Sequence, residues 1–206
     1  MSSCLPFVLA ALVLAVTPGP GIAYVVARTA AGGRAEGLAS CIGTAVGGMF
    51  HVAAAALGLS VLLVQSALAF SIVKYAGAAY LIYLGLRLLL SKKAHSHSAA
   101  VSARGARQAL RDGVLVEALN VKTALFFFAF LPQFVVPGPA IALQLGVMGI
   151  VCVVLNTLVD VLAVLGASRV LRSDSARRGR ERILAKASAA TMVGLGLYVA
   201  VFRRGT

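Results

Sequence analysis

Five polar residues stand inside two long apolar runs, and their types suit the binding of a small polar solute. Glu117, Asn120 and Lys122 lie within six positions, and Asn156 and Asp160 share one face of a later helix by their i, i+4 spacing. Ionisable groups in hydrocarbon are costly unless paired or hydrated, so they usually mark function. We expect Asn120, Lys122 and Asn156 to bind substrate, and Asp160 to accept a proton or a substrate ammonium. The alternative is a structural ion pair between Lys122 and Asp160.

The segment Thr17-Pro18-Gly19-Pro20 interrupts the first apolar run. Proline lacks an N–H and clashes with the carbonyl four residues earlier, and glycine adds backbone freedom. The cluster therefore predicts an unwound turn, whose free backbone groups are tolerated at membrane depth only against protein or a wet cavity. Because many secondary transporters build substrate sites from discontinuous helices, we expect Thr17, Pro18, Gly19 and Pro20 to bind substrate. The alternative is a proline kink that only shapes packing.

His51 lies near the middle of the second apolar run, after Gly43 and Gly47. The spacing of these two glycines indicates close helix packing. An imidazole changes charge near neutral pH, so His51 is a candidate for proton coupling; a hydrogen bond to a neighbouring helix fits equally well. His95 and His97 lie in a basic loop and the three cysteines stand singly, so we expect no metal site, no cofactor and no disulfide framework.

The composition places these residues in a membrane. Of 206 residues, 60% are hydrophobic and only 12% are charged, whereas soluble domains carry about a quarter charged residues. A soluble enzyme, a disordered chain and a nucleic-acid-binding module are thereby excluded. A membrane-crossing helix needs about 20 apolar residues, and six runs meet this need: 5–27, 37–64, 65–90, 113–135, 140–168 and 183–202. We predict an all-α membrane protein with six transmembrane helices, the first of them broken.

Charge asymmetry predicts the orientation. Fifteen Lys and Arg residues fall in the loops 28–36, 87–112 and 169–186, against three on the opposite side. Short cytoplasmic loops are enriched in Lys and Arg, so these loops are predicted inside and both termini outside. The net charge of +13 then reflects topology and lipid headgroups rather than nucleic acid.

The chain divides into two halves of a single domain. Residues 1–91 and 112–206 flank a basic loop, 92–111, and each half begins with a polar interruption of its first helix. Three helices per half would give the halves opposite orientations. This is the 3+3 inverted repeat of transporters whose site lies between the halves.

Several segments occur in a characteristic order: Thr17-Pro18-Gly19-Pro20, Gly33-Arg34 with Gly37, Lys74-Tyr75-Ala76-Gly77-Ala78-Ala79-Tyr80-Leu81-Ile82-Tyr83-Leu84-Gly85, Arg111-Asp112-Gly113, Asn120-x-Lys122 and Phe130-Leu131-Pro132-Gln133-Phe134. In this combination the chain resembles the LysE/RhtB family of amino-acid exporters, from about residue 5 to 202. The resemblance implies export of amino acids or related small metabolites, in exchange for protons. Val121 replaces the family's usual proline, and Gly48 stands where the family often has an acidic residue.

The predicted function is secondary active export by proton antiport in the cell inner membrane. No phosphate-binding loop occurs in the sequence, so a gradient must supply the energy. The expected partners are a small-molecule substrate, protons and membrane lipids, but no nucleic acid; a homodimer is left open. The alternatives are an intramembrane enzyme that uses Glu117 or His51 as acid–base groups, and a structural membrane subunit.

Overall fold

The structure is a computed structural model. It describes residues 4–61, 67–90, 102–136 and 138–170, together with isolated positions between 186 and 201. All regular structure within these residues is helical, which confirms the all-α class. The predictions for the two termini and for His95 and His97 lie outside the described residues, and the predicted last span is described at isolated positions only.

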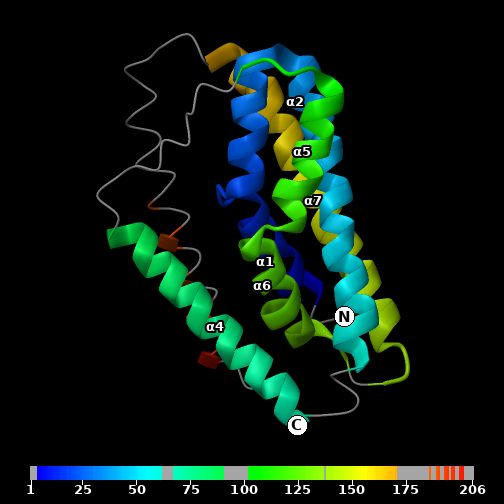
Figure 1. Cartoon of the computed structure of the whole chain (residues 1–206). Coiled ribbons are helices and arrows are strands. Elements are labelled where there is room, and N and C mark those ends of the chain that lie inside the picture. The colour runs from blue at the N-terminus through cyan, green and yellow to red at the C-terminus, as the bar shows by residue number, and fades with distance from the viewer. Residues whose placement is uncertain are drawn as a thin grey trace.

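The chain begins with a short helix, a break and a long helical hairpin. Helix α1 (Cys4–Val16) ends before the predicted interruption, and α2 (Pro20–Ala54) begins after it. Inside α2, Gly33 has φ 74° and ψ −168°, a conformation that is essentially confined to glycine. Val25 packs against Cys41, and a side chain at Gly37 would collide with Thr29. Both pairs are centred on residue 33, so α2 folds back there into two antiparallel arms (Figure 1).

The second broken helix lies in the other half of the chain. Helix α5 (Ala106–Ala118) and α6 (Val121–Leu125) meet at a bend of 42°, and α6 continues through the turns η2 (Phe126–Phe130) and η3 (Leu131–Phe134). The break forms although Val121 replaces the proline. Asn120 produces it instead, because its backbone is extended and its side-chain oxygen accepts the Lys122 N–H at 3.1 Å.

Most of the helices form one bundle. Helices α1, α5 and α7 (Ile141–Val170) lie beside the two arms of α2, which ends in the turn η1 (Ala55–Leu59), whereas α4 (Ala67–Leu90) leans away from them (Figure 1). Helices α2 and α5 approach most closely, since a side chain at Gly43 or Gly47 would collide with the α5 backbone. The predicted packing role of these glycines is thus confirmed.

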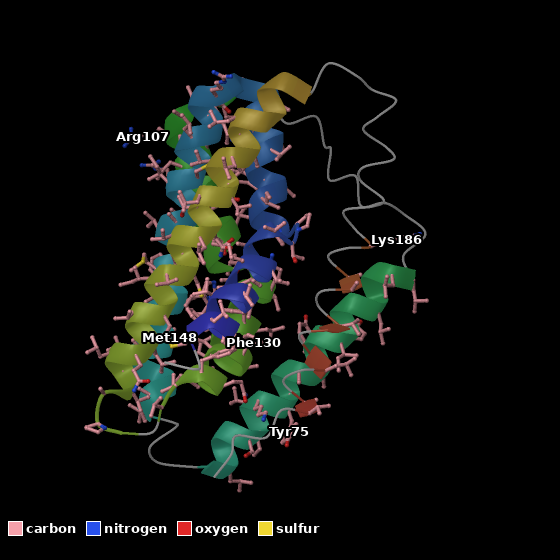
Figure 2. All side chains as sticks on the ribbon, turned by 180° about the vertical axis from the view of Figure 1, so that it is seen from behind. Tyr75, Arg107, Phe130, Met148 and Lys186 are labelled. Carbon is pink, nitrogen blue, oxygen red and sulfur yellow. The ribbon has the colours of Figure 1, made fainter. Side chains whose placement is uncertain are left out.

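The distribution of polarity is that of a membrane protein. Large apolar side chains project along the outside of the bundle (Figure 2), among them Leu143, Leu158 and Leu162 of α7, whereas Lys122 and Asp160 are buried. Among the described residues, Pro20–Leu59 and Ile141–Gly166 are long and apolar enough to cross a bilayer, and α5 with the segment to Phe134 makes a third span if the bent pair is counted as one. The 40 residues of Pro20–Leu59 would extend about 60 Å, twice the hydrocarbon thickness, so the fold at Gly33 accounts for their length.

Candidate functional site

The break between α1 and α2 leaves a carbonyl without its helical partner. In a helix the Leu14 carbonyl would accept the N–H of residue 18, but that residue is proline. The Lys122 ammonium takes this place: its Nζ donates to the carbonyl oxygens of Leu14 at 3.0 Å and Thr17 at 2.6 Å. The Lys122 side chain is buried, so a cation of α6 closes the end of α1.

The break between α5 and α6 is organised around Glu117. Its Oε2 accepts the Asn120 side-chain amide at 2.9 Å, and its Oε1 accepts the Thr123 hydroxyl at 2.6 Å. The backbone carbonyl of Glu117 lies 2.8 Å from His51 Nε2. Because a carbonyl only accepts hydrogen bonds, this contact assigns the proton of the neutral ring to Nε2.

Asp160 and Asn156 keep free polar groups. Asp160 is only 7% exposed, and its Oδ2 accepts the Thr44 hydroxyl at 3.0 Å. Within the described part of the chain, its second oxygen has no hydrogen-bond partner, and neither has the Asn156 side-chain amide. A carboxylate oxygen and an amide that line a cavity without partners among the described residues are suited to a polar ligand or to water.

These groups surround one open cavity of about 30 Å³, which is room for a few water molecules. Its polar wall combines both helix breaks with α7, and its apolar wall comes from small and branched residues. The lining residues are Ala15, Thr17, Gly19, Gly21, Ile22, Thr44, Ala45, Gly48, Glu117, Asn120, Lys122, Thr123, Val153, Asn156, Thr157 and Asp160.

The structure brings together six of the predicted site residues on this wall: Thr17, Gly19, Asn120, Lys122, Asn156 and Asp160. Pro18 and Pro20 shape the break but do not line the cavity, and Pro20 is exposed on the outside of the bundle. His51 lies behind the wall, where it contacts the Glu117 carbonyl and the Phe127 ring.

Lys122 and Asp160 line the same cavity without pairing. Both residues are described, and no ion pair within 4 Å joins them, so the alternative of a structural Lys122–Asp160 ion pair is wrong. The physical reason is that Pro18 has no N–H to donate to the Leu14 carbonyl. The Lys122 ammonium donates to this carbonyl instead of pairing with Asp160.

Three hydroxyl residues of the wall were not predicted from the sequence. Thr44, Thr123 and Thr157 carry no sequence signal, because threonine is common in membrane helices and its spacing here is not distinctive. Glu117 was identified only as a candidate acid–base group of the alternative enzyme, and the structure places it at the centre of the second break.

A second charged cluster lies at the end of the bundle where α2 folds back. Arg28 is 1% exposed, and it pairs with Glu36 at 3.4 Å and with Asp112 at 3.3 Å. Glu36 also accepts the backbone N–H groups of Arg104 and Gly105, at 2.9 and 2.7 Å. Arg28 was predicted to lie in a loop, 28–36, but it lies in α2 and joins this helix to the start of α5.

Two helix breaks that face a polar cavity inside an apolar bundle define a helical membrane protein of the transporter type. The family model of the LysE type translocator matches residues 12–202, and the chain belongs to this family. The resemblance found in the sequence is thereby confirmed.

Several relatives cover most of the chain. An uncharacterized membrane protein of Vibrio cholerae is 32% identical over 160 residues, which are 75% of this chain and 76% of the relative. The uncharacterized membrane protein YrhP of Bacillus subtilis is 32% identical over 174 residues, 80% of each chain. A homoserine/homoserine lactone efflux protein of Salmonella typhimurium is 28% identical over 153 residues, 74% of each chain. No solved structure matches the chain.

Proposed function

We propose that this protein is a secondary active exporter of amino acids or related small metabolites that carry an ammonium group. The observation that carries this proposal is the cavity between the two helix breaks, in which one Asp160 oxygen has no partner among the residues that the structure describes. Membership of the LysE type translocator family and the similarity to efflux proteins support it.

The substrate ammonium binds Asp160 and Asn156. The carbonyls of Leu14 and Thr17 do not serve this purpose, because the Lys122 ammonium already occupies them. Asp160 supplies a carboxylate and Asn156 an amide oxygen, and both are acceptors that suit an ammonium.

A substrate carboxylate, where there is one, lies at the start of α2. Gly19 caps this helix without a side-chain hydrogen bond, so the first N–H groups of α2 are not satisfied by the cap. Gly21 and Ile22, which carry two of these groups, line the cavity. A helix N-terminus attracts anions through these N–H groups and through its dipole.

Proton antiport supplies the energy. Asp160 alternates between a protonated state and a substrate-bound state. Protonation neutralises the carboxylate and so weakens its binding of the substrate ammonium, and the proton and the substrate therefore compete for Asp160. This exchange assigns the coupling to Asp160 rather than to His51, which lies behind the cavity wall.

The six-span topology with both termini outside, in the cell inner membrane, belongs to the same proposal. Its support is that α1 and α5, the first helices of the two halves, are both interrupted and that both interruptions face one cavity. This is the arrangement expected of a 3+3 inverted repeat.

The test is transport by everted membrane vesicles that contain the wild type, Asp160→Asn, or Thr29→Val as a control outside the cavity. With homoserine and homoserine lactone as the first substrates, we expect substrate-dependent proton movement in the wild type and the control. In the Asp160 variant we expect a fall of at least about tenfold, since hydrogen bonds to charged groups contribute about 1.5–3 kcal/mol. A normal rate in that variant would exclude Asp160 as the coupling group.

Two further outcomes address the alternatives. If Pro18→Ala and Pro20→Ala are fully tolerated in a growth assay with toxic substrate, the break has no transport role and a structural subunit is favoured. Conversion of the substrate into a new compound would favour the enzyme.

A further inference from the structure

Each of the two helix breaks is closed by a nitrogen-bearing side chain from the opposite half of the chain. At the end of α1, the first-half carbonyls of Leu14 and Thr17 accept Lys122 Nζ of the second half. In the last turn of α5, the second-half carbonyl of Glu117 accepts His51 Nε2 of the first half in addition to the Asn120 backbone N–H. The two contacts thus cross between the halves in opposite directions.

The Leu14 carbonyl needs such a partner because it lies inside the bundle without its helical donor, whereas the Glu117 carbonyl also accepts the Asn120 backbone N–H at 3.0 Å. An unpaired backbone group within a membrane protein is costly. Helix ends in general satisfy their last carbonyls with a following turn, a side chain or water. At α1 the following turn is prevented, since Pro18 has no N–H to offer the Leu14 carbonyl.

The surroundings of both nitrogens fit a capping role. The Lys122 ammonium has Glu117 and Asp160 as the acidic neighbours of its cavity, yet it bonds carbonyls and not carboxylates. A side chain at Gly19 would come within 3.1 Å of Nζ, so the ammonium is packed directly against the break. The His51 ring is buried against Phe127, at 5.9 Å between centroids, and does not line the cavity.

We propose that Lys122 and His51 are reciprocal capping residues: each holds open the helix break of the other half, and neither carries the substrate or the transported proton. They are positioning residues, which act on the cavity through the backbone of α1 and α5. This assignment revises the sequence-based expectation that Lys122 binds substrate and that His51 couples protons. The transport tests of this proposal rest on the proposed function, whereas the tests that measure thermal stability do not.

The Lys122 contact is tested by a double-mutant cycle with Pro18→Ala. Lys122→Met keeps the length of the side chain but removes the donor, so the thermal midpoint of the detergent-solubilised protein should fall. Pro18→Ala restores an N–H to the Leu14 carbonyl, so the same Lys122→Met change should lower the midpoint much less in that background. Lys186→Met, at an exposed position, is the control.

Equal effects of Lys122→Met in the two backgrounds would overturn the capping role at α1. A midpoint that Lys122→Met leaves unchanged would also overturn it. If transport is absent in every protein but the cycle shows the expected coupling, the capping role stands and the proposed function fails. The two results are therefore distinguishable.

The His51 contact is tested by comparing His51→Gln with His51→Leu. Glutamine keeps an N–H donor but cannot carry a proton between sites, whereas leucine keeps volume without a donor. We expect His51→Gln to retain the thermal midpoint and the pH profile of transport. We expect His51→Leu to lower transport by up to about tenfold, because it removes one of the two hydrogen bonds to the Glu117 carbonyl. Loss of proton-coupled transport in His51→Gln with an unchanged midpoint would overturn the proposal and make His51 a proton carrier.

Discussion

At the scale of single residues, Glu117 shows how a carboxylate inside a membrane protein is satisfied without an ion pair. Both of its carboxylate oxygens accept hydrogen bonds, from Asn120 and Thr123, and its carbonyl lies within hydrogen-bond distance of His51. Since Asn120 lies in the break and Thr123 lies just after it, the Glu117 side chain joins the end of α5 to α6 and fixes the geometry of the turn rather than offering a free acceptor to substrate.

We therefore expect Glu117→Leu to destabilise the protein by about 1–3 kcal/mol, because two buried donors lose their acceptor. Glu117→Gln should cost less, since its amide keeps one acceptor oxygen. Thermal unfolding of the detergent-solubilised variants measures both effects. An unchanged midpoint in Glu117→Leu together with lost substrate binding would instead assign Glu117 to the ligand.

At the scale of elements, the two breaks have different local causes. In α1–α2 the prolines remove N–H donors, so the interruption is built into the covalent chain. In α5–α6 no proline is present, and Asn120 caps the next helix with its own side chain. The hairpin of α2 has a third cause, the positive φ of Gly33.

Gly33→Ala should destabilise the protein by about 1–3 kcal/mol, because a Cβ is strained at this backbone conformation. Open space surrounds a Cβ at this position, so the whole cost is conformational. Gly146→Ala is the matched control: it also has open space around its Cβ but lies inside α7, where alanine is favoured. Thermal midpoints of the two variants should move in opposite directions, and equal shifts would contradict this explanation of the hairpin.

At the scale of the whole molecule, the Arg28 cluster closes one end of the bundle that contains the cavity. Arg28 lies seven positions along α2 from Gly21, which lines the cavity, and Asp112 lies eight positions from Asn120. At about 1.5 Å per residue, the cluster is about 10–12 Å from the cavity wall. The same end carries Arg107 of α5, whose position Figure 2 labels.

The proposed orientation places this end in the cytoplasm, and thiol labelling tests it. In a background without the native cysteines, a cysteine at Arg107 should react with a membrane-impermeant maleimide only in everted vesicles. A cysteine at Ala140, which is exposed in the segment before α7, should react in intact cells. The reverse pattern would invert the topology and place both termini inside.

Much of this architecture was predictable from the sequence, but the pairing of the site residues was not. Pro18 and Pro20 predict the helix break because proline has no N–H to donate. Asp160 is recognisable because it is the single charged residue of the apolar run 140–168. The burial of Arg28 was not predictable. A charged residue close to Gly32 and Gly33 is typical of a loop, and its partner Asp112 comes from α5, which is distant in the sequence. Whether the Lys122 ammonium binds a carboxylate or backbone carbonyls was also not predictable, because it depends on where α1 lies.

The sequence by itself determined that this is a helical membrane protein with an interrupted first helix, because apolar length and proline chemistry act locally along the chain. Only the tertiary structure decided that both interruptions meet at one cavity, that Lys122 and His51 contact backbone carbonyls of distant helices, and that one Asp160 oxygen has no partner among the described residues. Those features depend on distances between segments far apart in the chain, and a hydrogen bond of 3 Å is specified only when the helices that carry its two atoms have packed.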